Sequence, residues 1–116
     1  MISHNEFHPK GWGHELWLVN IPEYCGKVLH IEAGKRCSLH FHKIKTETMY
    51  LSKGRVRMIY GPIDNPKEST KIMEVGDVFH IPPLLAHRFE ALEDSDIIEF
   101  STQHFESDSY RIETGD

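Results

Sequence analysis

The sequence predicts a single all-β domain, and three observations support this prediction. The chain has 116 residues, which is the length of one domain. Its apolar segments are short, about four to six residues each, and rich in β-branched and aromatic side chains. No stretch of ten or more residues shows the apolar period of 3.6 that marks an amphipathic helix. Short strands at this spacing are typical of a β-sandwich or β-barrel.

Nine strands are expected, and residues that favour turns separate them. The expected strands cover residues 15–19, 26–31, 37–42, 48–51, 55–60, 70–75, 78–81, 87–92 and 97–102. The turns between them are marked by Gly34, Gly54 and Gly76 and by the Gly- or Pro-containing segments 61–62, 64–66 and 82–83. Each expected strand is too short for a stable helix, and most contain the β-branched or aromatic residues that fit a pleated surface.

Composition excludes several classes of function. The formal net charge is -5 and no basic cluster is present, so nucleic acid is not an expected partner. A mean hydropathy of -0.46 and the lack of any long apolar run argue against a membrane protein. Residues 1–10 are polar and His-rich, unlike a signal peptide. The two cysteines, Cys25 and Cys37, form no CxxC pair, so we expect reduced thiols and a cytoplasmic protein.

Strand alternation predicts that segment 37–42 has one polar and one apolar face. Side chains two residues apart on a strand share a face. The polar face would carry Arg36, Ser38, His40 and His42, and the apolar face would carry Cys37, Leu39 and Phe41. Two imidazoles about 7 Å apart on one face can reach the same metal ion. With nine histidines in the chain, however, a His-x-His pair alone is weak evidence for a metal site.

The spacing around this pair is specific, and it resembles the cupin superfamily. Gly34, His40, His42, Glu47 and Gly54 fall at the positions of the first cupin motif. A second motif is matched at Gly76, Pro82 and His87, although Leu84 stands where Gly is usual and Ala91 where Asn is frequent. The resemblance implies a small cupin β-barrel of jelly-roll type. It also implies a homodimer and a metal held by His40, His42, Glu47 and His87.

The ligand chemistry narrows the choice of metal. Three imidazoles and one carboxylate suit one divalent transition metal, namely Zn, Mn, Ni, Co or Fe, better than Mg or Ca. Four protein ligands leave one or two coordination positions open to water or a substrate oxygen. The donor set therefore fits a catalytic site, but it does not identify the metal.

The flanking segments resemble a narrower group, the cupin domain of the type II mannose-6-phosphate isomerases. The matching segments are 11–17, with its two tryptophans, Lys27, the stretch from Gly34 to Leu39, residues 97–101 and residues 108–113. His40 departs from that group, which usually has Gln at this position. The resemblance implies a metal-dependent isomerase or epimerase acting on a sugar or sugar phosphate.

Candidate catalytic and substrate-binding residues follow from what such a reaction needs. Glu99 is the expected base if it faces the interior, where burial would raise its pKa, and Glu47 would assist at the metal. The alternative is that Glu99 points to solvent or pairs with a lysine. Arg36, assisted by Ser38 and Lys27, is the candidate for binding an oxyanion. Lys43 and Lys45 are expected only to solvate their loop. Trp12 and Trp17 are expected to pack in the core or at an interface, and the alternative is a platform that stacks on a sugar ring.

The expected domain covers residues 1–116, with a core barrel at about 24–103. The N-terminal segment 1–23 and the tail 104–116 would pack on the barrel or on a dimer partner. An outward apolar face at Cys37, Leu39 and Phe41 would favour a homodimer. Two other functions remain open: a non-haem iron dioxygenase of a small organic acid or thiol, and a non-catalytic module that binds a small ligand.

Overall fold

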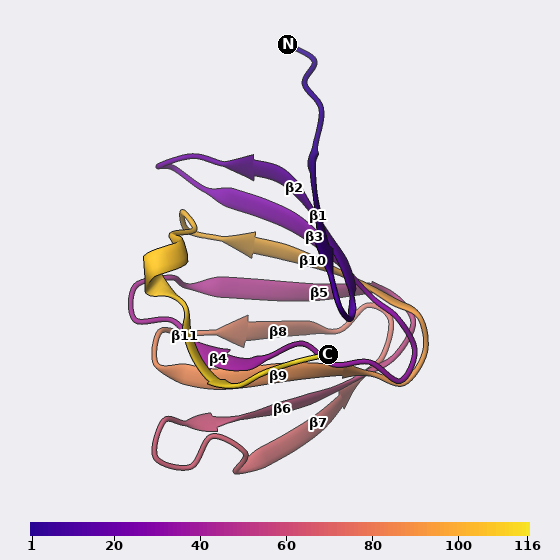
Figure 1. Cartoon of the computed structure of the whole chain (residues 1–116), viewed down its shortest axis with the longest axis vertical. Coiled ribbons are helices and arrows are strands. Elements are labelled where there is room, and N and C mark those ends of the chain that lie inside the picture. Colours follow the sequence, from indigo (N-terminus) through magenta and orange to yellow (C-terminus); the bar gives the residue numbers. More distant parts are fainter.

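Two antiparallel sheets face each other across the interior of the molecule (Figure 1). The computed structural model describes all residues, 1–116. The strands are β1 (Glu6–Lys10), β2 (Gly13–Asn20), β3 (Cys25–Ile31), β4 (Leu39–Phe41), β5 (Glu47–Lys53), β6 (Val56–Pro62), β7 (Ser69–Met73), β8 (Val78–Ile81), β9 (Leu85–Ala91), β10 (Ser95–Ser101) and β11 (Tyr110–Glu113), with one 3-10 helix, η1 (Glu106–Asp108). The fold is an all-β jelly roll, as the sequence predicts.

The order of the strands explains which segments meet. The six-stranded sheet runs β1-β2-β3-β10-β5-β8, and the five-stranded sheet runs β11-β4-β9-β6-β7. All nine predicted strands are present, although β4 is only three residues long. The two strands missed by sequence, β1 and β11, lie at sheet edges, where polar residues and a proline are tolerated. No helix in the structure is long and apolar enough to cross a bilayer.

The N-terminal segment and the tail both become part of the sheets. β1 and β2 extend the six-stranded sheet beyond β3, and β11 pairs with β4 at the edge of the other sheet. The Asp108 carboxylate, just before β11, accepts hydrogen bonds from the backbone N–H groups of Lys43, Ile44 and Lys45. The tail is therefore fixed against the loop that follows β4.

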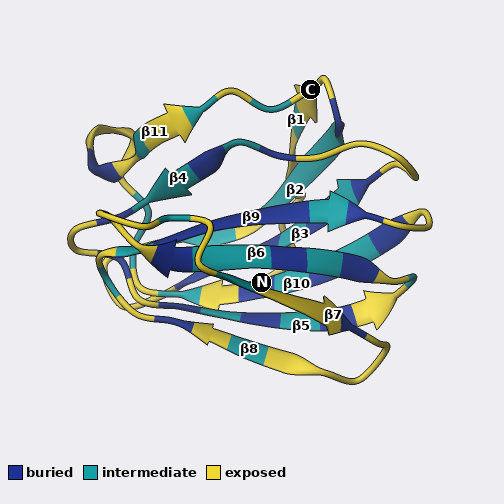
Figure 2. Ribbon diagram, turned by 90° about the horizontal axis from the view of Figure 1, so that it is seen from below, coloured by how far each residue is buried: buried dark blue, intermediate teal, exposed yellow.

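The inward faces of the long strands change from polar to apolar along their length. On three strands an inward ionisable residue is followed by core residues: Lys27 by Leu29 and Ile31 on β3, Glu47 by Met49 and Leu51 on β5, and His87 by Phe89 and Ala91 on β9. Thirteen buried residues form one apolar cluster. Burial is greatest on central strands such as β9, whereas the edge strands β7 and β8 are largely exposed (Figure 2). The barrel thus has an apolar end and a polar end.

The predicted outward apolar patch beside β4 does not exist. Cys37 lies in the core cluster, and Leu39 is fully buried. The Phe41 ring is half-buried and stacks on Tyr110 of β11 at 5.1 Å. The prediction was wrong because regular pairing begins only at Leu39, so strand alternation does not extend back to Cys37, and because β11 packs beside β4.

Candidate metal centre and cavity

Three histidines converge at the polar end of the barrel. His40 on β4 is directly opposite His87 on β9 in the sheet register, and His42 follows two residues later. A ligand nitrogen from each ring lies within 4.8 Å of those of the other two. His42 and His87 are buried, and His40 is half-buried. Three imidazoles at this separation can bind one metal ion.

Backbone carbonyls orient all three rings. The Nδ1 atoms of His40, His42 and His87 lie 3.1, 2.8 and 2.9 Å from the carbonyl oxygens of Ser38, Asp108 and Leu85, respectively. A carbonyl oxygen can only accept a hydrogen bond, so each Nδ1 carries the proton. The Nε2 lone pairs are then free to bind a metal. Carbonyl partners of this kind commonly fix the tautomer of metal-binding histidines.

Glu47 completes the cluster. Its Oε1 atom lies 3.1 Å from Nε2 of His42 and 3.6 Å from Nε2 of His87. Glu47 Oε1 and His87 Nε2 are both buried without a hydrogen-bond partner. With Nδ1 of His87 protonated, these two atoms are acceptors that face each other, which is unfavourable in a buried site unless a cation lies between them. The four residues therefore fit a divalent transition metal.

The protonation states of His40 and Glu47 also suit metal binding. Burial, reinforced by the neighbouring His87 and His42, lowers the pKa of His40 to about 3. Burial opposes the charged form of Glu47, but the neighbouring His42, His87 and Lys45 lower its pKa overall. A neutral His40 and an ionised Glu47 are the forms that coordinate a metal.

Glu99 faces the same interior from β10, the strand next to β5 in the six-stranded sheet. It is buried, and its Oε2 atom accepts from Lys45 Nζ at 2.7 Å and from Ser101 Oγ at 3.0 Å. Burial and the charge of Glu47 raise the pKa of Glu99. Glu99 therefore faces the interior, as the first expectation had it, and is also paired with a lysine, as the alternative had it.

Lys45 is buried, contrary to the prediction that it solvates a loop. Besides Glu99, its Nζ atom lies 3.8 Å from Glu47 Oε2 and 3.1 Å from Nδ1 of His104. Lys45 therefore links the histidine cluster on one side to Glu99 on the other. Sequence reasoning missed both Lys45 and His104 because the contacts that hold them inside, Lys45 with Glu99 and Lys45 with His104, join residues far apart in the chain.

Lys27 projects into the cavity beside Trp17. Lys27 is opposite Glu99 in the register of β3 and β10, and its Nζ lies 4.0 Å from the centre of the Trp17 ring. The nearest carboxylate oxygen, Glu15 Oε1, is 3.8 Å away and already accepts from Trp17 Nε1 at 2.8 Å. Burial lowers the pKa of Lys27 despite the carboxylates around it. Lys27 is thus a buried amine without a close hydrogen-bond acceptor.

Arg36 lies outside this cavity. It bridges to Glu90 on the outer side of the five-stranded sheet, half of its side chain is exposed, and its Nη1 lies 3.9 Å from Glu90 Oε2. The cation at the cavity rim is instead Arg111 on β11, which is opposite His40 in the sheet register. Arg111 makes no ion pair with any carboxylate of the chain. Ser38 does line the cavity, and its Oγ lies 3.1 Å from His40 Nδ1.

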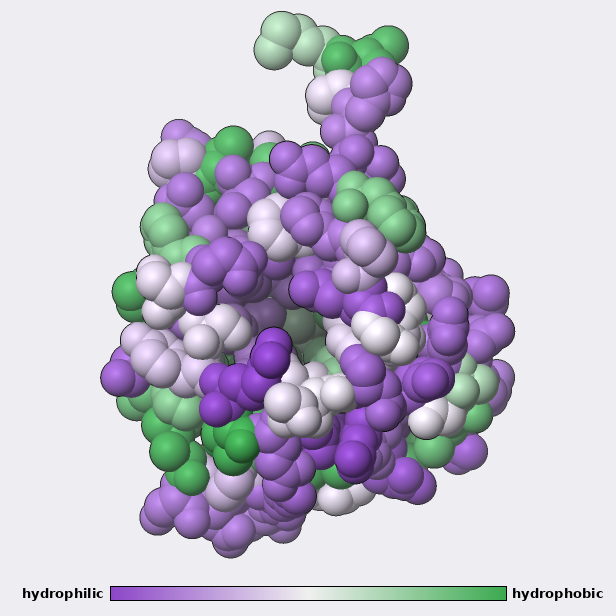
Figure 3. Space-filling model, viewed as in Figure 1, coloured by the Kyte–Doolittle hydropathy of each residue, from purple (hydrophilic) through white to green (hydrophobic).

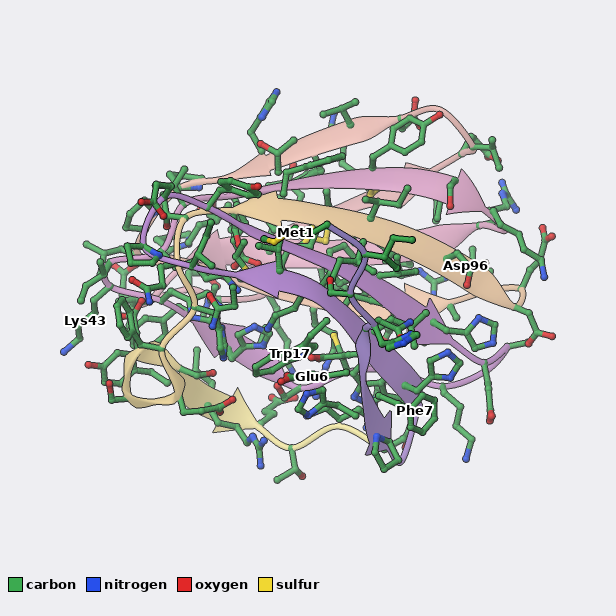
Figure 4. All side chains as sticks on the ribbon, turned by 90° about the horizontal axis from the view of Figure 1, so that it is seen from above. Met1, Glu6, Phe7, Trp17, Lys43 and Asp96 are labelled. Atoms are coloured by element: carbon green, nitrogen blue, oxygen red, sulfur yellow. The ribbon has the colours of Figure 1, made fainter.

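The cavity has a volume of about 450 Å³. It is lined by the three histidines, by Glu47 and Glu99, and by Lys27, Lys45 and Arg111, but not by Arg36. The space-filling view shows a hollow in the middle of the molecule with a mostly hydrophilic rim (Figure 3). Trp17 lies toward this interior, whereas Lys43 projects at the periphery (Figure 4). Trp12 also lines the cavity but is buried in the core cluster, consistent with packing. A cavity of this size is suited to a small polar molecule.

The chain belongs to the cupin family. The family profile for cupins matches residues 27–113, which include all four candidate metal ligands. The jelly-roll architecture and the histidine cluster are the structural counterparts of the two motifs in the sequence. No curated protein matches the sequence.

Several solved structures share the fold at low sequence identity. The capsular polysaccharide assembling protein CapF from Staphylococcus aureus superposes with a TM-score of 0.79 and 19% identity over 97% of this chain and 34% of CapF. Oxalate decarboxylase from Bacillus subtilis gives 0.79 and 17% over 93% of this chain and 30% of that enzyme. KdgF from Halomonas sp. gives 0.75 and 16% over 88% of this chain and 91% of KdgF. The chain thus spans about a third of CapF, and these likenesses establish the fold alone.

Proposed function

We propose that the protein is a metal-dependent isomerase or epimerase that acts on a sugar or a sugar phosphate. The observation that carries this proposal is the presence of two different carboxylates in one cavity. Glu47 lies against the histidines with an oxygen that lacks a hydrogen-bond partner, while Glu99, on the neighbouring strand β10 of the same sheet, pairs with Lys45. One carboxylate is thus placed to bind a metal, and the other remains available for proton transfer.

His40, His42, His87 and Glu47 would hold the metal. A bound divalent ion in this site would polarise a carbonyl or hydroxyl oxygen of the substrate. The protein prepares the site by fixing all three rings through backbone carbonyls. It also keeps the ligands in a largely buried pocket, where electrostatic effects are stronger than in water.

Glu99 would transfer the proton. In an aldose–ketose isomerisation, a base removes a proton from the hydroxyl-bearing carbon next to the carbonyl and returns it to the former carbonyl carbon, while the hydroxyl proton moves from one oxygen to the other, so no net proton is consumed. The Oε2 atom of Glu99 is fixed by Lys45 and Ser101, whereas its Oε1 atom makes no hydrogen bond. Oε1 is therefore the atom we assign to proton transfer. The raised pKa of Glu99 favours proton exchange closer to neutral pH than an ordinary glutamate allows.

Cations and one hydroxyl around the metal ligands suit an anionic, oxygen-rich substrate. Lys27 offers a buried ammonium group, and Arg111 offers a guanidinium at the rim, where it can bind two oxyanion oxygens. Ser38 adds a hydroxyl beside His40. The description of CapF as a capsular polysaccharide assembling protein is a further, fold-level reason to test carbohydrates first.

The test measures solvent deuterium exchange together with metal content. Protein purified without chelator is analysed by elemental mass spectrometry, then incubated in deuterated water with a panel of sugar phosphates. We expect about one metal per chain and deuterium incorporation that the Glu99→Gln variant abolishes while retaining the metal. The matched control is Glu68→Gln, which changes an exposed carboxylate of a loop and leaves exchange intact.

Other outcomes would replace the proposal. One equivalent of iron with substrate-dependent oxygen uptake would indicate a dioxygenase of a small acid or thiol. Sugar phosphate binding that needs no metal and produces no exchange would indicate a binding module. Full exchange by Glu99→Gln would exclude Glu99 as the base.

The proposal includes a homodimer and a reducing, cytoplasmic location. Cys25 and Cys37 are both free and buried, as expected for structural thiols in a reducing compartment. The surface that would form the dimer must differ from the one that the sequence suggested, because the β4 patch is covered.

A further inference from the structure

Two buried lysines line the cavity, and their side-chain amines are bonded differently. The Nζ atom of Lys45 lies 2.7 Å from Glu99 Oε2 and 3.1 Å from Nδ1 of His104, so two acceptors hold it. Lys27 is buried to the same degree, at 3% exposed, but its nearest carboxylate oxygen, Glu15 Oε1, is 3.8 Å away and beyond hydrogen-bond distance. Since buried polar groups are normally bonded, an unbonded amine in a cavity calls for an explanation.

The strands around Lys27 hold its amine in place. Lys27 lies on β3, opposite Trp17 of β2 in the sheet register, and its Nζ atom is 4.0 Å from the centre of the Trp17 ring. β2 lies between β3 and β1, and His8 of β1 stacks on Trp17 at 4.0 Å. Trp17 is therefore fixed between two neighbours, and the amine of Lys27 lies on a rigid aromatic surface in the cavity wall.

Two carboxylates lie near this amine and line the same cavity. Glu15 is the closer one, and Glu99 occupies the position of β10 directly opposite Lys27. An amine that attacks a carbonyl group gives up protons, so the reaction needs a nearby group that accepts a proton and returns it. Lys27 thus has the partners that a nucleophilic lysine requires.

The neutral amine is the form that attacks a carbonyl, and burial of Lys27 favours this form. Burial lowers the pKa of Lys27, and the charge of Lys45, from the loop between β4 and β5, lowers it further. Glu99 on β10 and Glu15 on β2 act in the opposite direction, but burial has the largest effect. Lysines that form imines are commonly desolvated in this way.

We propose that Lys27 is a covalent capture site for the aldehyde or ketone group of a small anionic compound. The lone pair of Nζ attacks the carbonyl carbon, a C–N bond forms, and one amine proton moves to the carbonyl oxygen. The C–O bond then breaks, and the oxygen leaves as water with the second amine proton. One amine and one carbonyl thus give one imine and one water, with no oxidant or reductant, and hydrolysis reverses the step. Arg111, at the rim and without an ion pair, would bind the anionic group.

This activity is separate from the proposed isomerisation. It needs neither the metal nor the removal of a proton from carbon, because the amine and both carboxylates belong to the chain. In the proposed isomerase, Lys27 acts as a cation that binds an oxyanion, whereas here its amine bonds to the carbonyl carbon. The two roles use different protonation states of one group, and chemical trapping of the imine distinguishes them.

The test traps the imine by reduction. Protein in a chelator at pH 7 is incubated with glyceraldehyde 3-phosphate and sodium cyanoborohydride, which reduces an imine to a stable secondary amine, and is analysed by intact mass and peptide mapping. We expect the adduct to form at Lys27 at least about tenfold faster than at any other lysine, because the cavity holds the carbonyl beside the amine. Inorganic phosphate should slow this labelling by competing for Arg111.

Two variants and one matched control accompany the trapping. Lys27→Met and Lys27→Arg should both lose the fast adduct. The control is Lys71→Arg, which removes an exposed lysine of β7 and should leave the fast adduct intact. Circular dichroism and a cooperative thermal transition verify that each variant is folded. If neither Lys27 variant folds, the peptide map of the wild type still locates the adduct.

Three results would overturn the inference. The first is labelling in which Lys27 is no faster than the exposed lysines. The second is equal selectivity for Lys27 in urea-unfolded protein, since the fold would then contribute nothing. The third is binding of the sugar phosphate without any adduct at Lys27, which would leave this residue as a cation only. Deuterium exchange is measured separately and without reductant, so its absence would refute the isomerase and leave the capture site standing.

Discussion

Replacing Lys45 by Met should destabilise the protein strongly, because it leaves a buried carboxylate without its cation. Lys45 is 2% exposed, and its Nζ atom lies 2.7 Å from Oε2 of a 4% exposed Glu99. Removing one partner of a buried ion pair costs about 3–5 kcal/mol. Since domains of this size have total stabilities of about 5–15 kcal/mol, the loss would be a large fraction of the whole. At roughly 3–5 °C per kcal/mol, the melting temperature should fall by about 10–20 °C.

The assay is urea denaturation at pH 7 in the presence of a chelator, so that only protein groups contribute. A double-mutant cycle compares Lys45→Met, Glu99→Gln and the double variant. The double variant should cost at least about 2 kcal/mol less than the sum of the single variants, because it leaves neither charge of the pair behind. The matched control is Lys67→Met, which breaks an ion pair of similar length, 2.6 Å to Glu113, whose side chains are about half exposed. Solvent screens that pair, so its loss should have little effect.

The pH dependence gives a second check on the same reasoning. Burial and Glu47 raise the pKa of Glu99 in the folded protein, and the loss of Lys45 raises it further. A carboxyl whose pKa is raised in the folded state binds its proton more tightly there than in the unfolded chain. Its ionisation therefore lowers the free energy of unfolding once the pH rises above the pKa of the unfolded chain, about 4.3. The penalty of Lys45→Met should therefore be greatest at pH 7 and shrink toward pH 4. A penalty below about 1 kcal/mol at pH 7, or strict additivity in the cycle, would refute the assignment of a buried ion pair.

Three other predictions concern single positions. Asp108→Asn should cost about 1–2 kcal/mol at pH 7, because the carboxylate accepts from three backbone N–H groups. Burial opposes ionisation of Asp108, but those hydrogen bonds lower its pKa overall. The wild type should therefore be more stable than the Asn variant at neutral pH, and this difference in the free energy of unfolding should disappear as the pH falls through the folded pKa. Urea denaturation at a series of pH values measures it. Gly54→Ala should cost more than about 1 kcal/mol, since φ is +89° and a Cβ atom would collide with Ser95 and the Asp94 carbonyl; an unchanged urea midpoint would contradict this. Cys37 should react with a thiol reagent only after unfolding, because burial raises its pKa to about 11, and rapid labelling of the native protein would show that it is accessible.

The strands could be predicted well from sequence because their signal is local. Apolar alternation and Gly or Pro turns determine where a strand begins and ends, and β2 to β10 follow those signals closely. β1 and β11 lack such a signal because edge strands need only one covered face and tolerate polar residues. The length of β4 depended on its neighbours, since regular pairing with β9 and β11 is confined to its few residues.

The site was only partly predictable from sequence. Residues in local motifs were found, whereas residues that depend on the pairing of distant strands were not. Motif spacing placed His40, His42, Glu47 and His87 together, and the structure brings these four side chains into one cluster. Arg36 was expected on the same face as His40 because the alternation of β4 was extended too far toward the N-terminus. Arg111 occupies the expected place of that cation, but only the pairing of β11 with β4 shows this. No local pattern distinguishes a tail strand from a frayed end.

The division of the barrel into an apolar and a polar end explains how the fold tolerates so many buried charges. Nine of the 26 buried residues are polar or charged, and Lys27, Lys45, Glu47 and Glu99, the two lysines and two glutamates of the proposed site, are among them. Each is costly to bury, even in a paired state. The cost is offset by the thirteen-residue apolar cluster, part of which lies further along β3, β5 and β10, the strands that carry Lys27, Glu47 and Glu99. Replacing both partners of a buried ion pair together, such as Lys45 and Glu99, by apolar residues should therefore stabilise the domain while it removes the chemistry, whereas removing one partner alone destabilises it.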